Sequence, residues 1–278
     1  MDPYGEVKMV ELFEGDMRAE NRRSSKGNQL KWENDGIWYK ADYTGYEGLA
    51  EYVISRLLGF TQLEPEEYVS YDTEEIRYKR RIYRGCKSRN FLPEGWSLIT
   101  LERLFENCCG MGLNKCIYRI EDHRERLRFL VEQTERYTGL SDFGGYMSKL
   151  LTVDTLFLNE DRHTHNIAVL RDGQGAYQYC PIFDNGAGLL ADITMDYPLG
   201  EAPEELAEEA EPKTFCQSFD EQLDIAEELY GQRLHFSCGK QELAAVLDRE
   251  LFYPPEIRER VKELLLFQYR KYRYLFQE

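Results

Sequence analysis

LNEDRHTHN (residues 158–166) and PIFDNG (residues 181–186) are the two most informative segments of this chain. The first contains Asp161 and Asn166, separated by a short loop, and the second contains Asp184. Phosphoryl transfer from Mg-ATP requires such a set, because one acid must meet the substrate hydroxyl and other oxygens must bind magnesium. We therefore take Asp161 as the candidate catalytic carboxylate, which would accept or orient the proton of the substrate hydroxyl. Asn166 and Asp184 are the candidate magnesium ligands.

The sequence between the two segments predicts a β-hairpin. An apolar strand, a turn with two glycines and a return strand are predicted at residues 167–170, 171–176 and 177–183. Because the ends of an antiparallel hairpin meet, Asn166 and Asp184 are expected to lie side by side. Alone, Asp-Arg-His is commonly a surface loop and Asp-Asn-Gly is commonly an Asx turn. Their placement at the two ends of one hairpin favours a catalytic site.

A lysine upstream supplies a candidate phosphate-binding group. Lys40 lies in the apolar segment IWYKA (residues 37–41), and a helix is predicted at residues 46–58. Glu47 and Glu51 share one face of that helix, so either could hold the ammonium in place. We favour Glu51 because it lies deeper in the helix. Most strand lysines are simply solvated, but a lysine and a helix glutamate placed before the acidic loop favour nucleotide binding.

The overall composition excludes several classes of function. The chain has 278 residues, 42% of them hydrophobic, which is enough for a large core. Its formal net charge of -16 argues against nucleic acid as a partner, because a phosphate backbone requires a basic surface. No apolar run is long enough to cross a bilayer, which argues against a membrane location. The seven cysteines have neither disulfide nor zinc spacing, so we expect reduced thiols in a cytoplasmic protein.

The order of predicted elements indicates an α+β, bilobal, protein-kinase-like fold, with a small β-rich N-lobe (residues 1–95) and a larger helical C-lobe (residues 96–278). In the N-lobe, strands are predicted at residues 6–13, 29–32, 36–41 and 68–83, the last interrupted at 72–74, and a linker at 91–95. In the C-lobe, helices are predicted at residues 124–137, at 141–158 with Ser141 as the cap, and from Pro255 onward. An acidic run at 201–211 contains six glutamates and predicts a solvated helix face.

The loop SSKGNQLK (residues 24–31) precedes the lysine strand and could place backbone N–H groups over phosphates. Together with the segments above, it gives the chain a resemblance to serine/threonine kinases of the HipA-like family, nearest to their short, single-unit forms. The family pattern matches this chain at Ser24, Gly27, Gln29, Lys31, Asn159, Asp161, Arg162, His163, Asn166, Asp184 and Gly186.

The resemblance implies specific roles. ATP and Mg2+ would be the cofactors, and a protein would be the substrate. The loop serine of the family is autophosphorylated, which ejects the loop and silences the kinase; here that role would fall on Ser24, with Ser25 beside it. Longer family members carry an additional N-terminal subdomain and work with a DNA-binding antitoxin. This chain has no room for that subdomain, so we do not carry over a toxin–antitoxin role, and a regulatory partner protein is left open.

Three alternatives use the same residues. A lipid or small-molecule phosphotransferase could share the loop, since phosphoinositide kinases have Asp-Arg-His-x-x-Asn, although the acidic chain counts against a membrane-surface substrate. A pseudokinase would bind nucleotide without transfer. His163 and His165 with Asp161 could bind zinc, but the position of Asp184 favours His163 as a packed residue that braces the catalytic loop.

Overall fold

A computed structural model describes residues 9–18 and 29–277 of the chain. Five strands form one sheet in the order β1-β4-β5-β3-β2: β1 (Val10–Glu11), β2 (Lys31–Asn34), β3 (Ile37–Ala41), β4 (Asp72–Tyr78) and β5 (Arg81–Arg89). A second sheet has the order β6-β7-β8: β6 (Ser97–Thr100), β7 (Ala168–Arg171) and β8 (Tyr177–Tyr179). The structure therefore has a strand-rich N-terminal part.

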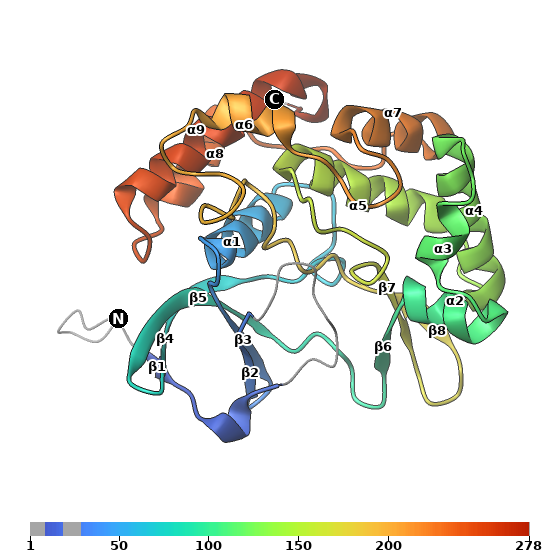
Figure 1. Cartoon of the computed structure of the whole chain (residues 1–278), viewed down its shortest axis with the longest axis horizontal. Helices are drawn as coiled ribbons and strands as arrows, with labels where there is room; N and C mark the ends of the chain where they lie inside the picture. Colours follow the sequence, from blue (N-terminus) through green and yellow to red (C-terminus); the bar gives the residue numbers. More distant parts are fainter. Residues whose placement is uncertain (1–8, 19–28, 278) are drawn as a thin grey trace.

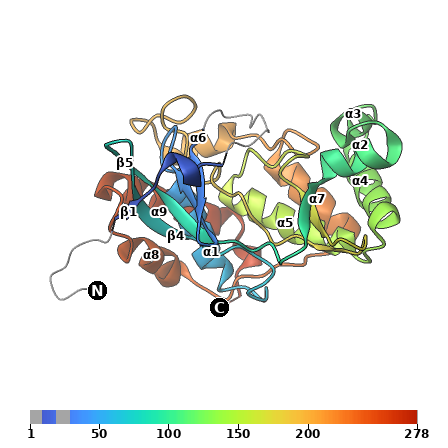
Figure 2. The ribbon, with the colours of Figure 1, turned by 90° about the horizontal axis from the view of Figure 1, so that it is seen from below.

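The rest of the described chain is mainly helical. The helices are α1 (Glu47–Leu58), α2 (Leu101–Cys109), α3 (Leu113–Ile117), α4 (His123–Thr138), α5 (Phe143–Phe157), α6 (Pro203–Glu209), α7 (Phe219–Tyr230), α8 (Lys240–Asp248) and α9 (Pro255–Lys271), with short 3-10 turns η1 (Glu14–Asp16) and η2 (Arg273–Leu275). The five-stranded sheet and α2–α4 lie at opposite ends of the molecule (Figure 1), and the second view places α8 and α9 on the same side as α1 (Figure 2). None of the described helices is long and apolar enough to span a membrane.

Strands occupy much of the stretch predicted at residues 68–83, but the interruption was placed incorrectly. Asp72, Thr73 and Glu74 do not break the strand; they begin β4 and pair with β5. The buried carboxylate of Glu74 also accepts a hydrogen bond from Lys87 on β5 at 2.7 Å. The turn lies instead at Lys79 and Arg80, whose φ angles are 47° and 65°. Charged residues in a strand resemble a turn until their cross-strand partner is known.

Three other predicted boundaries also differ from the structure. Helix α5 begins after Asp142 rather than after Ser141, and Asp142 has a left-handed backbone, with φ of 61°. The return strand of the hairpin ends at Tyr179, because the chain then leaves the second sheet. Its Ile182 exchanges backbone hydrogen bonds with residues 67 and 69 instead, at 2.8 and 2.9 Å. The hairpin is therefore shorter than expected, and β1 is shorter than the strand predicted at 6–13, part of which lies outside the described residues.

Helix α1 lies where the sequence predicted it and packs closely on the first sheet. A Cβ atom at Gly48 would lie 2.4 Å from the backbone carbon of Gly85 on β5, so only glycine allows this approach. The apolar face of the helix (Leu49, Val53, Leu57 and Leu58) is fully buried in the large core shared with the helical part. As a result, α1 is held between the sheet and the C-terminal helices, and it presents Glu51 toward β3.

Asp42, directly after β3, is a buried carboxyl group at this junction. Its two oxygens accept hydrogen bonds from the N–H of Gly48 and the hydroxyl of Tyr253, both at 2.7 Å. Burial, with a smaller contribution from Glu47, raises the pKa of Asp42 to about 7. The folded protein therefore holds the proton of Asp42 more tightly than the unfolded chain does.

This raised pKa predicts a pH dependence of stability. A carboxyl group with a raised pKa contributes stability at low pH, and the contribution is lost as the pH rises through the folded-state pKa. Between about pH 5 and pH 8, the wild type should lose up to about 3 kcal/mol of unfolding free energy relative to Asp42→Asn. Urea unfolding at both pH values measures the difference. The same comparison with Asp35→Asn, at an exposed turn, should show no such loss; equal behaviour of the two variants would contradict the prediction.

Candidate active site

Lys40 is held between two carboxylates. Its Nζ atom lies 2.6 Å from Oε1 of Glu51 and 2.7 Å from Oδ1 of Asp184, and 5.2 Å from the ring centroid of Tyr71. Burial alone would lower the pKa of Lys40, but Asp184 and Glu51 raise it well above its ordinary value. The ammonium therefore stays charged and fixed in position.

Glu51, and not Glu47, is the partner of this lysine. The second oxygen of Glu51 accepts the backbone N–H of Asn185 at 2.9 Å, which connects α1 to the segment at residues 181–186. Glu47 lies one turn earlier and instead accepts the N–H groups of the loop before the helix, including that of Thr44 at 2.7 Å. The two glutamates therefore have different roles, one at the site and one at the start of α1.

Asp184 has an unusual backbone conformation and a strongly acidic carboxyl group. Its φ of 59° lies in the left-handed region, which is uncommon for a residue other than glycine. Although burial alone would raise the pKa of Asp184, the ammonium groups of Lys40 and Lys31 lower it well below its ordinary range. Asp184 is therefore ionised at any physiological pH, as a ligand for a cation must be.

A buried arginine joins the catalytic loop to the Asp184 segment. The Nε atom of Arg162 donates to both oxygens of Asp154, at 3.1 and 3.0 Å. Its Nη1 donates to the backbone oxygens of Asn166 and Phe183, at 3.1 and 2.7 Å, and its Nη2 to Oδ1 of Asn185 at 2.7 Å. One guanidinium thus holds both ends of the hairpin together, and these ends meet as expected.

The sequence alone did not predict a role for Asp154. It marked Arg162 only as a match to the family motif. A signal was present, because Asp154 is the one ionisable residue in the apolar run LLTVDTLFL (residues 150–158). An acid in such a run must be paired when it is buried. Its partner could not be identified from the sequence, since Arg162 lies beyond the end of α5 and reaches back to it.

Asp161 and Asn166 are directly connected. The amide Nδ2 of Asn166 donates to the backbone oxygen of Asp161 at 2.9 Å and lies 3.5 Å from the Oδ2 atom of its side chain. Because the amide nitrogen is used in this way, the Oδ1 atom of Asn166 is its available acceptor. Asp161 and Asn166 thus lie together in one loop, and both line the cleft described below.

One cleft collects most of the predicted residues. Its lining consists of Gln29, Lys31, Tyr43, Thr44, Glu47, Glu51, Asp161, Asn166, Asp184, Gly186, Ala187 and Asp192. Lys40 lies behind this lining, bonded to Glu51 and Asp184. The predicted loop residues Ser24, Ser25 and Gly27 lie outside the described residues.

Tyr43, Thr44 and Asp192 also line the cleft, and sequence reasoning did not predict them. They are brought there by pairing between the loop before α1 and the segment after residue 186. The N–H of Thr194 donates to the oxygen of Thr44, and the N–H of Tyr46 to the oxygen of Ala191, both at 3.1 Å. No local motif marks this contact, which joins residues far apart in the chain.

His163 contacts Asp161 and His165 within the loop at residues 159–166 and is not among the residues that line the cleft. Its Nε2 atom lies 3.7 Å from Oδ1 of Asp161, and its Nδ1 accepts the N–H of His165 at 3.3 Å. Burial lowers the pKa of His163, with Asp161 acting in the opposite direction. In the described part of the chain, no group of three or more His, Cys, Asp or Glu side chains is arranged to hold a metal.

The oxygen atoms of the cleft fit magnesium. Asp161, Asn166 and Asp184 present carboxylate and amide oxygens to one space, and Mg2+ prefers such ligands. Magnesium usually needs one or two protein ligands, because phosphates and water complete its coordination. Asn166 and Asp184 are therefore sufficient as a protein contribution to a magnesium–nucleotide site.

The fold is similar to that of a known kinase. The crystal structure of CtkA, a proinflammatory kinase of Helicobacter pylori, matches with a TM-score of 0.61 over 95% of this chain and 95% of that chain, at 14% sequence identity. No family model matches the chain, and neither does any curated protein. The prediction of an α+β, kinase-like fold is thereby confirmed, and the likeness at this identity concerns the fold.

Proposed function

We propose that this protein is an ATP- and magnesium-dependent protein serine/threonine kinase of the HipA-like type. The observation that carries the proposal is the position of Lys40 between Glu51 and Asp184, at 2.6 and 2.7 Å, directly behind a cleft lined by Asp161 and Asn166. These groups are the parts that phosphoryl transfer uses in kinases. The kinase-like fold supports the same conclusion.

The residues divide the work between binding and chemistry. Lys40, oriented by Glu51, would contact the nucleotide phosphates, and Asp184 with Asn166 would hold the metal. When bound, magnesium would neutralise part of the negative charge on the nucleotide phosphates. Asp161 would accept or orient the hydroxyl proton of the acceptor serine, so that the oxygen can attack the terminal phosphate. The guanidinium of Arg162 keeps Asn166 and the Asp184 segment at a constant separation.

The reach of the chain supports self-phosphorylation at Ser24 or Ser25. Gln29 and Lys31, at the end of that loop, line the cleft. Three residues lie between Ser25 and Gln29 in the sequence, so a short stretch of chain connects the predicted acceptor serines to a residue of the cleft lining. The self-phosphorylated serine of the HipA-like family belongs to the corresponding loop.

Incubation with Mg-ATP followed by intact-mass measurement tests the proposal. We expect the mass to increase by one phosphate, located at Ser24 or Ser25 by peptide mapping. EDTA should abolish the gain, and so should Asp161→Asn. The separate variants Ser24→Ala and Ser25→Ala assign the acceptor.

Other outcomes would support the alternatives. Transfer of label to lipids or small alcohols, but not to this chain or to denatured lysate proteins, would overturn the protein-kinase proposal in favour of a small-molecule phosphotransferase. Nucleotide binding without transfer to any of these acceptors would identify a pseudokinase.

A further inference from the structure

An open groove with a volume of about 1050 Å3 lies between the start of α8 and the end of α9, away from the candidate active site. Lys240 reaches it from α8, Arg270 from α9, and Arg273 from η2. Ligand sites commonly enclose about 300–1,000 Å3. The groove is therefore large enough for a short segment of another molecule, and its charged lining indicates what kind.

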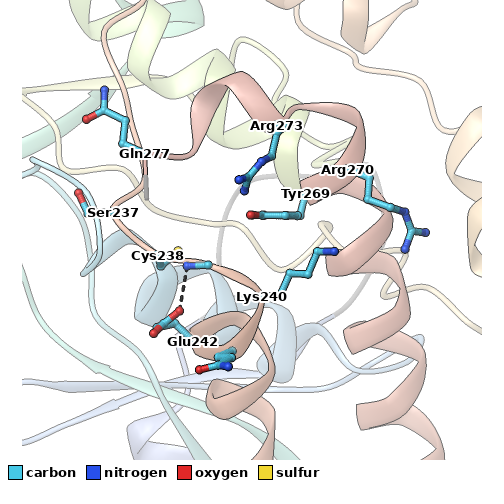
Figure 3. A pocket seen from close by; sticks show the side chains of 10 residues that line it. Ser237, Cys238, Lys240, Glu242, Tyr269, Arg270, Arg273 and Gln277 are labelled. Carbon is cyan, nitrogen blue, oxygen red and sulfur yellow. Dashed lines mark hydrogen bonds between the residues drawn. The ribbon is translucent and has the colours of Figure 1, made fainter.

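Two of the cations are arranged around one fixed aromatic ring. The Nζ atom of Lys240 lies 5.7 Å from the ring centroid of Tyr269, and the guanidinium carbon of Arg273 lies 4.8 Å from it. Figure 3 shows the ring between the two side chains. Tyr269 is buried, so its position is set by the core. Cation–π contacts of this kind hold the two charged groups near one another, despite their mutual repulsion.

The groove is basic on a protein that is strongly acidic. The chain has 35 Lys and Arg residues against 51 Asp and Glu residues, so most cations should find an acidic partner. Yet among the described residues neither Lys240 nor Arg270 forms an ion pair. Glu242 is the one acid among the described residues of the lining, and its carboxylate already accepts the N–H of Gly239 at 2.9 Å (Figure 3). The lining therefore carries three cationic side chains, Lys240, Arg270 and Arg273, and one carboxylate.

We infer that this groove binds a phosphorylated segment of a partner protein. Arginine presents a planar fork of donors that matches phosphate oxygens, and Arg270 and Arg273 are three residues apart at one end of α9. Nucleic acid is a poorer fit, because its phosphates would continue past the groove onto a surface of net charge -16. The neutral residues of the lining offer hydrogen-bonding groups to a peptide backbone. This inference does not depend on the proposed kinase activity.

The position of the groove also places the bound segment near the C-terminal end of α1. The N–H of Ser237, a lining residue, donates to the oxygen of Phe60 at 2.6 Å, and Phe60 lies just beyond the C-terminal end of α1. Helix α8 packs against α1 as well. The partner would thus dock near the C-terminal end of α1, whereas Glu47 and Glu51 of its N-terminal half line the candidate cleft, so the cleft would remain accessible.

Fluorescence polarisation with the full chain, without nucleotide, tests the inference. The probe is a labelled pool of short peptides with random sequence around a central phosphoserine. The comparison pools carry serine or glutamate at that position, and inorganic phosphate is the competitor. We expect the phosphoserine pool to bind about 10- to 100-fold more tightly than either comparison pool, as charge-assisted hydrogen bonds to phosphate imply.

The matched variants are Lys240→Glu/Arg270→Glu in the groove and Lys115→Glu/Arg119→Glu on a distant exposed surface. Both change the net charge equally, but only the first should abolish binding. If it does not fold, Lys240→Gln/Arg270→Gln takes its place. Equal binding of the serine or glutamate pool would overturn the inference. Binding of the phosphoserine pool to the groove variant would also overturn the inference. The same holds if inorganic phosphate displaces the labelled phosphopeptides at concentrations as low as those at which unlabelled phosphopeptides displace them.

Discussion

Replacing Asp161 by asparagine is expected to lower the rate of phosphoryl transfer by about 10²- to 10⁴-fold, the usual contribution of a general acid or base. The side chain lines the cleft within 3.5 Å of the Asn166 amide. Asparagine keeps its shape but cannot accept the hydroxyl proton. The initial rate of labelled phosphate transfer from Mg-ATP, to this chain or to a lysate protein, measures the effect.

The control for this prediction separates catalysis from folding. Asp35→Asn makes the same chemical change at an exposed turn with φ of 50°, a conformation that asparagine tolerates well. It should transfer phosphate at the wild-type rate. Thermal unfolding of Asp161→Asn should also remain close to that of the wild type. If Asp161→Asn transfers phosphate at a rate within a few-fold of the wild-type rate, Asp161 is not the catalytic carboxylate.

Replacing Asp154 by alanine is expected to destabilise the fold by about 3–5 kcal/mol, the usual effect of breaking a buried ion pair. Asp154 and Arg162 have exposed side-chain fractions of 0% and 1%. Without the carboxylate, the guanidinium would stay buried with only neutral oxygens as partners. Urea unfolding, followed by the intrinsic fluorescence of the chain, measures the free energy.

A double-mutant cycle with Arg162→Ala shows whether the loss belongs to this pair. The double variant should be far more stable than the sum of the two single effects implies, because no unpaired charge then remains. An exposed pair, Glu125 with Arg128 on α4, provides the comparison, and its Glu125→Ala variant should change stability little. Additive effects of Asp154→Ala and Arg162→Ala would show that the pair is not coupled.

Local patterns were sufficient to predict most of the elements and the chemical groups. The spacing of apolar residues located α1 and α9, and the two segments around the hairpin predicted that Asp161, Asn166 and Asp184 lie in one site. These features depend on residues that are close in sequence. Prediction failed where a distant partner decides the local structure, as at residues 72–74, which form a strand because their backbone pairs with β5.

The sequence by itself determined which side chains are available for the proposed phosphoryl transfer and in what order they occur. Only the tertiary structure decided how they are paired. Glu51 lies beside Lys40 because Gly48 lets α1 approach β5 closely, and Lys40 contacts Asp184 across 144 positions of sequence. The basic groove likewise unites Lys240 with Arg270 and Arg273 from separate elements. Such pairings depend on long-range packing, in which the burial of many apolar side chains positions a few polar ones, and no local pattern encodes that geometry.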